Sequence, residues 1–154
     1  NISLNRMQDS VFCIPKALSD KSGKVAYDGF GRDDWGRINN SVLPDEKNII
    51  GALEAISLDE FVFQEGHPPA DLIKIDVEGG EGRVLAGARQ LLKKFKPVII
   101  CEIHGPEAAR QVSDELSGLG YRFEDAKGKP LASIPGDYGH IVAFPESGAF
   151  QASR

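Results

Sequence analysis

The stretch Asp71-Leu-Ile-Lys-Ile-Asp-Val-Glu-Gly-Gly-Glu81 decides how this sequence is interpreted. An apolar run of strand length leads there into three acids, Asp76, Glu78 and Glu81, beside two glycines at the start of a helix. In a parallel α/β sheet, ligands bind outside the carboxyl ends of the strands. The stretch therefore predicts a functional site. The plainer alternative is a solvated loop with a helix-start acid, but capping would explain only Glu81.

The composition predicts one globular domain, which we place at residues 1–145 with a C-terminal tail at 146–154. A net charge of -5 without a long basic run argues against nucleic acid or an anionic membrane surface as a partner. No apolar run approaches the roughly 20 residues that span a bilayer, and the N-terminus lacks a signal-peptide layout. Cys13 and Cys101 lie in apolar runs typical of strands, which favours buried thiols over a disulfide. We therefore predict a cytoplasmic protein.

The order of the predicted elements indicates an α/β fold. Apolar patterns predict strands at 11–18, 49–56, 71–76, 98–101, 121–124 and 140–144, and helices at 57–63, 80–95 and 106–119. Residues 25–40 predict a short strand and a long surface loop. From Asp71 onwards, strands and helices alternate before two final strands. This order predicts a parallel sheet with right-handed crossovers and a C-terminal antiparallel hairpin, with the strand at 98–101 covered on both faces.

Five stretches of the sequence stand out as motifs, namely Lys74–Glu81, Val84–Ala88, Pro97–Glu102, Ala17–Asp20 with Gly23, and Ser57–Asp59. In residues and spacing they resemble the FkbM-type family of S-adenosylmethionine-dependent methyltransferases. Gly80 stands where the family often has alanine. The resemblance implies a Rossmann-like class I methyltransferase sheet, mostly parallel, and S-adenosylmethionine as the cofactor.

The resemblance covers only the later part of the family's domain. A nucleotide-type site usually needs an early strand, a glycine-rich turn and an acid about 20 residues further on. Nothing before Val11 supplies these parts, so we expect a fragment without the first two strands, in which Asn1–Asn5 ends the preceding helix. Gly29-Phe-Gly31 has the G-x-G spacing, but no periodic helix follows it, which favours a turn.

The candidate site residues follow from the chemistry of methyl transfer to a hydroxyl, which needs aligned reactants and a proton acceptor. If the two strands are neighbours, Asp76 and Glu78 share a rim with Glu102 and His104. The predicted catalytic residues are Asp76, Glu78 and His104. The resemblance implies that Ala17, Leu18 and Ser19 contact the cofactor, and Asp76 is a further predicted cofactor contact. The predicted substrate contacts are Trp35, Arg37, Glu81 and Glu102.

Each of these assignments has an alternative. Asp76 could bond loop amides, Glu81 could stabilise the helix start, and His104 could be an ordinary loop histidine. The four rim residues could also ligate a divalent cation. We assign no metal ligand at this stage.

The leading hypothesis is a methyltransferase that acts on oxygen of a small metabolite or a sugar, as a fragment that is inactive alone. A second hypothesis is a truncated or degenerate domain that binds no cofactor and acts as a binding module. A third is a hydrolase that uses Asp76 and Glu78, although no G-x-S-x-G motif occurs. The sequence also leaves open whether the protein forms a homo-oligomer.

Overall fold

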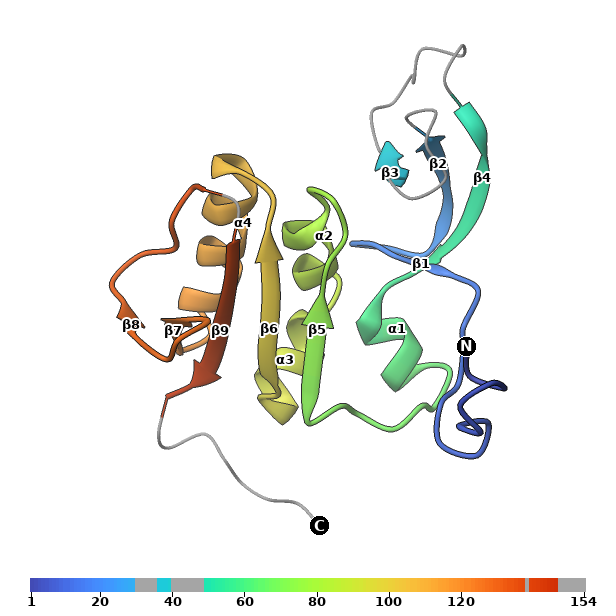
Figure 1. Cartoon of the computed structure of the whole chain (residues 1–154), viewed down its shortest axis with the longest axis horizontal. Coiled ribbons are helices and arrows are strands. Elements are labelled where there is room, and N and C mark those ends of the chain that lie inside the picture. The colour runs from blue at the N-terminus through green and yellow to red at the C-terminus, as the bar shows by residue number, and fades with distance from the viewer. Residues whose placement is uncertain (30–35, 40–48, 138, 147–154) are drawn as a thin grey trace.

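The computed structural model describes residues 1–29, 36–39, 49–137 and 139–146. They form a mixed α/β fold with two separate β-sheets (Figure 1). None of the helices in these ranges combines the length and the hydrophobicity needed to cross a bilayer. Some of the predicted features lie outside the described residues. They are Trp35, residues 30–31 of the predicted Gly29–Gly31 turn, the tail from residue 147, and the side chain of Arg37.

The first sheet has the strand order β1-β4-β2-β3. Its strands are β1 (Ala17–Leu18), β2 (Gly23–Gly29), β3 (Gly36–Asn39) and β4 (Ile49–Ile56). β1 is parallel to β4, whereas β2 is antiparallel to both β3 and β4. The strand predicted at 49–56 is confirmed.

The strand predicted at 11–18 is shorter than expected, because only Ala17 and Leu18 pair with a neighbour. Residues 11–16 have no regular secondary structure, and residues 2–6 and 8–10 form turns. The helix end expected at Asn1–Asn5 is a single turn closed by the Asn5 N–H bond to the Asn1 carbonyl. Phe12 is 79% exposed, and Cys13 is exposed as well. The prediction of a buried thiol is therefore wrong for Cys13, since an apolar run without a pairing partner has no core to enter.

The second sheet has the order β5-β6-β9-β7-β8. Its strands are β5 (Leu72–Ile75), β6 (Val98–Ile103), β7 (Tyr121–Asp125), β8 (Pro130–Leu131) and β9 (Gly139–Pro145). β5 and β6 are parallel, but β9 lies between β6 and β7 and is antiparallel to both. The predicted antiparallel pairing of the last strands is confirmed. The mostly parallel Rossmann-like sheet is not confirmed, because both sheets are mixed.

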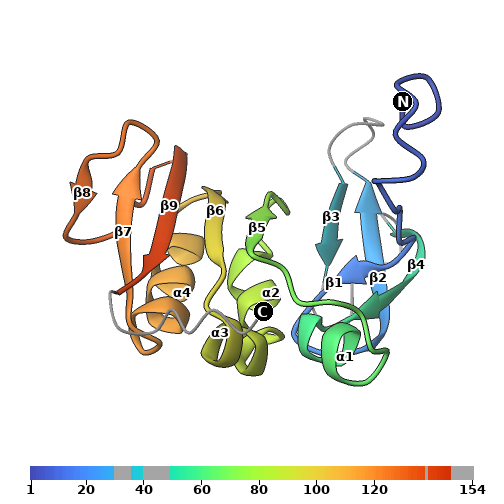
Figure 2. The same ribbon diagram turned by 90° about the horizontal axis from the view of Figure 1, so that it is seen from below.

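Four helices accompany the sheets in the described part of the chain. They are α1 (Leu58–Phe63), α2 (Glu81–Ala86), α3 (Arg89–Phe95) and α4 (Pro106–Ser117). Helices α2, α3 and α4 lie on one face of the second sheet (Figure 2). Alternate residues of β6, Ile99, Cys101 and Ile103, point into the core on that face. The described helices thus cover β6 on one face, not on both as the sequence predicts.

The single helix predicted between residues 80 and 95 is divided into α2 and α3. At the break, a Cβ on Gly87 would lie only 2.2 Å from the backbone oxygen of Ser19, so the loop after β1 packs directly on the glycine. The carboxylate of Asp59 accepts hydrogen bonds from the backbone of Gln90 at 3.0 Å and of Leu91 at 2.8 Å. This carboxylate therefore caps α3 from a distant part of the chain. Periodicity alone cannot reveal such a contact.

Candidate functional site

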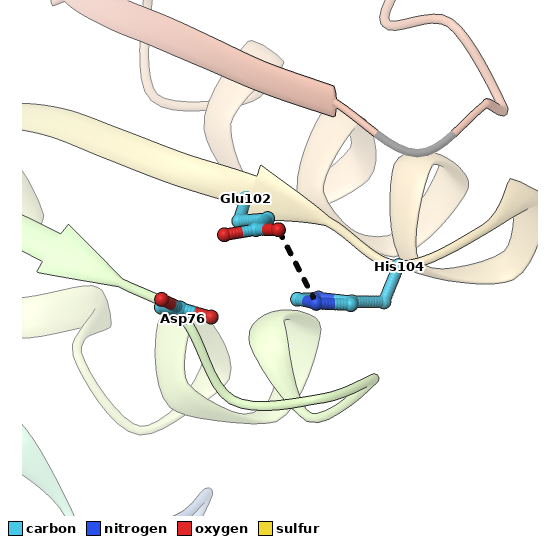
Figure 3. Close-up of side chains that lie close together, drawn as sticks. All are labelled: Asp76, Glu102 and His104. Atoms are coloured by element: carbon cyan, nitrogen blue, oxygen red, sulfur yellow. Dashed lines mark ion pairs between the residues drawn. The ribbon is translucent and has the colours of Figure 1, made fainter. Parts of the chain in front are cut away.

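The parallel pairing of β5 with β6 brings the ends of the two strands together. Ile75 of β5 is level with Cys101 of β6. Asp76 directly follows β5, Glu102 is the residue after Cys101 in β6, and His104 directly follows β6. Each of these three side chains has one oxygen or nitrogen atom that lies within 4.8 Å of those of the other two (Figure 3). The polar rim expected from the sequence is thus present as a spatial cluster. The roles of its members stay predictions.

The loop after β5 turns sharply through left-handed backbone. Glu78 has a φ of 45° and Gly79 a φ of 92°. Residues other than glycine, asparagine and aspartate rarely adopt left-handed backbone. The backbone at Glu78 is therefore strained. The turn points the Glu78 side chain at the rim, where its Oε1 lies 3.5 Å from His104 Nε2. Glu78 is therefore the fourth member of the rim.

His104 is held from behind by Glu81. Its side chain is only 5% exposed, and its Nδ1 contacts Oε1 of Glu81, which is fully buried. The same Glu81 oxygen accepts a hydrogen bond from the Gly79 N–H at 3.2 Å. Glu81 Oε2 has no hydrogen-bond partner among the described residues. This burial favours a positioning role for Glu81 over the substrate contact that the sequence suggested.

Two further side chains contact the rim. Lys74 Nζ lies 2.7 Å from Asp76 Oδ2, and this hydrogen bond is the main reason why the pKa of Asp76 is below its usual value. His140 on β9 places Nε2 3.1 Å from Glu102 Oε2. We did not predict a site role for His140, because its register opposite Glu102 depends on the insertion of β9 beside β6.

The charges of this cluster are unbalanced. The carboxylates of the rim and of Glu81 outnumber Lys74, the one lysine or arginine that pairs with them in the described ranges. Apart from its two histidines, the cluster therefore has more acidic than basic side chains. Such a site attracts a cation, or a ligand with a positive centre.

The predicted cofactor segment lies at the edge of the first sheet. Ala17 and Leu18 are half-buried in β1, and Ser19 is 2% exposed. The Ser19 N–H donates to the Ile56 carbonyl at 3.1 Å, and its hydroxyl donates to Asp20 Oδ1 at 3.0 Å. The backbone bond fixes the segment to β4, while its contact with a cofactor stays a prediction.

A cavity of about 210 Å³ adjoins the rim at His140. The carboxyl-bearing residues Asp125 and Asp137 line it, together with apolar residues such as Leu131. Because His140 also contacts Glu102, this cavity is a space in which a small acceptor could bind beside the rim. Its volume lies below the roughly 300–1,000 Å³ of pockets for drug-sized ligands, which favours a small acceptor.

Comparison with known proteins gives two matches. Residues 2–123 match the family model described as the Methyltransferase FkbM domain. The fold is similar to the crystal structure of methyltransferase FkbM from Methylobacillus flagellatus KT, with a TM-score of 0.53 and 14% sequence identity. That match covers 92% of this chain and 32% of the other, so the chain spans about a third of that protein's length. Among curated proteins, none matches the chain.

Proposed function

Because the chain belongs to the FkbM methyltransferase family, we propose that it acts in methyl transfer from S-adenosylmethionine to a hydroxyl oxygen of a small metabolite or a sugar. The observation that supports this proposal best is the convergence of Asp76, Glu78, Glu102 and His104 at the ends of two parallel strands. This is the edge of an α/β sheet at which ligands bind.

The two unpaired cysteines support a cytoplasmic location.

The residues of the rim suit part of the cofactor. S-adenosylmethionine, when bound, supplies a methyl group on a positively charged sulfur. The excess of carboxylates at the rim would favour that positive charge, and Asp76, fixed by Lys74, would position it. Ala17, Leu18 and Ser19 would contact the adenine ring, as the family resemblance implies.

The proton of the acceptor hydroxyl needs a base. Methylation forms the new oxygen–carbon bond, breaks the sulfur–carbon bond and releases this proton. Glu78 is suited to accept it, because its side chain is 30% exposed at the rim and is paired with His104 Nε2. Glu81 keeps the imidazole in place, so His104 in turn orients Glu78. The acceptor would sit in the cavity beside His140.

Calorimetry with S-adenosylmethionine tests the proposal. We expect saturable binding to this chain, or to a longer form if its gene encodes one, and weaker binding after Asp76→Asn. The matched control is Asp114→Asn, an exposed acid of α4 that is paired with Arg110 away from the rim. If neither form binds the cofactor, the methyltransferase proposal fails, and the cofactor-free binding module is favoured instead.

A further inference from the structure

The spacing of Asp76, Glu102 and His104 is close to that of a metal coordination shell. With bonds of about 2.1 Å, octahedral ligands lie about 3 Å apart when adjacent and about 4.2 Å apart when opposite. The three donor atoms lie within 4.8 Å of one another, so small side-chain movements would close them around an ion. They come from the ends of two paired strands, which fix the backbone positions of the donors.

The environment of His104 is that of a metal ligand. Histidine ligands almost always bond through one ring nitrogen to the metal and through the other to a carboxylate or a carbonyl. Here Glu81 contacts Nδ1, and Nε2 faces the rim, 3.5 Å from Glu78 Oε1 and 3.8 Å from Glu102 Oε1. The buried carboxylate therefore fixes both the ring and the nitrogen that faces the other donors.

Glu81 supplies a second, independent observation. It is fully buried, and its Oε2 has no hydrogen-bond partner in the described part of the chain. An unpaired buried oxygen costs free energy, and such a residue calls for an explanation in terms of the site that it serves. The contact of Glu81 with Nδ1 identifies His104 as the residue that it serves.

The existing partners of the two acids leave room for an ion. Lys74 bonds Oδ2 of Asp76, and His140 contacts Oε2 of Glu102. Each partner thus occupies one oxygen of its carboxylate. In Glu102 the other oxygen, Oε1, is the one that lies nearer to His104.

We propose that Asp76, Glu102 and His104 bind a divalent first-row transition metal ion through two carboxylates and one imidazole. This donor set suits Mn²⁺, which accepts both oxygen and nitrogen ligands, better than a purely oxygen-ligated ion. Three ligands leave positions open for water or for the hydroxyl of an acceptor. Glu78 is outside the set, and an ion on Nε2 would replace the contact that Glu78 makes there.

Titration of the chain with Mn²⁺ in the absence of a methyl donor tests the proposal. Calorimetry should find one ion per chain, and Asp76→Asn and Glu102→Gln should each weaken binding at least tenfold. Glu81→Gln should weaken Mn²⁺ binding by about 10- to 100-fold, as is usual for residues that hydrogen-bond a metal-ligating side chain. Glu54→Gln is the matched control, because Glu54 is an exposed strand residue of the other sheet, and it should leave the affinity unchanged.

A spectroscopic measurement on the unmodified chain avoids reliance on folding of the variants. Electron spin echo modulation of bound Mn²⁺ should show coupling to an imidazole nitrogen. This coupling should vanish in His104→Gln and persist in His67→Gln, because His67 stacks on Phe61 instead. Absence of Mn²⁺ binding at millimolar concentration, or equal binding by Glu102→Gln and Glu54→Gln, would overturn the proposal. Neither result bears on cofactor binding, so the two proposals fail separately.

Discussion

Replacing Gly87 with alanine should destabilise the protein, because this glycine is where the loop after β1 meets the helix break. An added Cβ would lie 2.2 Å from the backbone oxygen of Ser19 and 3.1 Å from both the Asp20 Cα and the Ser57 Cβ. Gly87 has a φ of -80°, which alanine adopts without strain. The penalty therefore comes from steric contact alone.

The magnitude follows from what must move. The blocking atom is a backbone oxygen, and the Ser19 N–H is bonded to the Ile56 carbonyl, so no side-chain rotation relieves the clash. Overpacking of this kind costs about 1–3 kcal/mol. The displacement would also weaken the hydrogen bond from the Asp59 N–H to the Gly87 carbonyl, now 2.8 Å, and its loss adds about 1 kcal/mol. We expect the free energy of unfolding to fall by about 2–4 kcal/mol.

Urea unfolding followed by circular dichroism measures this change. Gly118→Ala is the control, because its Cβ would meet only the Asp114 oxygen, at 3.8 Å. A glycine in such an open site gains about 0.4–1 kcal/mol of stability on replacement by alanine. Equal midpoints for the two variants would refute the packing of the β1 loop on the helix break, and with it the placement of Ser19.

Three other changes have clear outcomes. Asp59→Ala should lower the free energy of unfolding by about 1–2 kcal/mol in urea, because it removes the side-chain cap of α3. Burial raises the pKa of Tyr121 from 10.0 to about 12, so the folded state keeps a proton that the unfolded chain loses. Stability should therefore fall as the pH rises from 10 towards 12, and Tyr121→Phe should reduce this fall while removing the bond to the Pro97 carbonyl. At pH 8 a disulfide reagent should modify Cys13 rapidly but Cys101 only after unfolding, since burial raises the pKa of the Cys101 thiol to about 12.

Local sequence signals predicted the local structure well. Ser57 accepts a hydrogen bond from the Glu60 N–H at 3.1 Å, as its position before an acidic first turn indicated. The strand that ends before Asp76 and the helix that begins at Pro106 were likewise expected from patterning. The break at Gly87 was not, because it depends on contacts with residues far away in the sequence.

The candidate site was also predictable only in part from the sequence. The general rule for strand ends predicted that Asp76 and Glu102 would meet, since it requires only that the two strands be neighbours. The pairing of Glu81 with His104 could not be predicted, because a helix-start acid is expected to stabilise its own helix. The contact of His140 with Glu102 was also hidden, because no sequence pattern placed β9 between β6 and β7.

Glu81 connects the fold to the chemistry of the rim. Its bond to the Gly79 N–H stabilises the turn that carries Glu78, and its contact with Nδ1 holds His104. A glutamine could accept both bonds through its carbonyl oxygen, but its NH2 group would then lie where Oε2 has no hydrogen-bond partner among the described residues. Both bonds of Glu81 lead to residues of the rim or of its turn, so the rim, and not the helix start, explains the acid at this position.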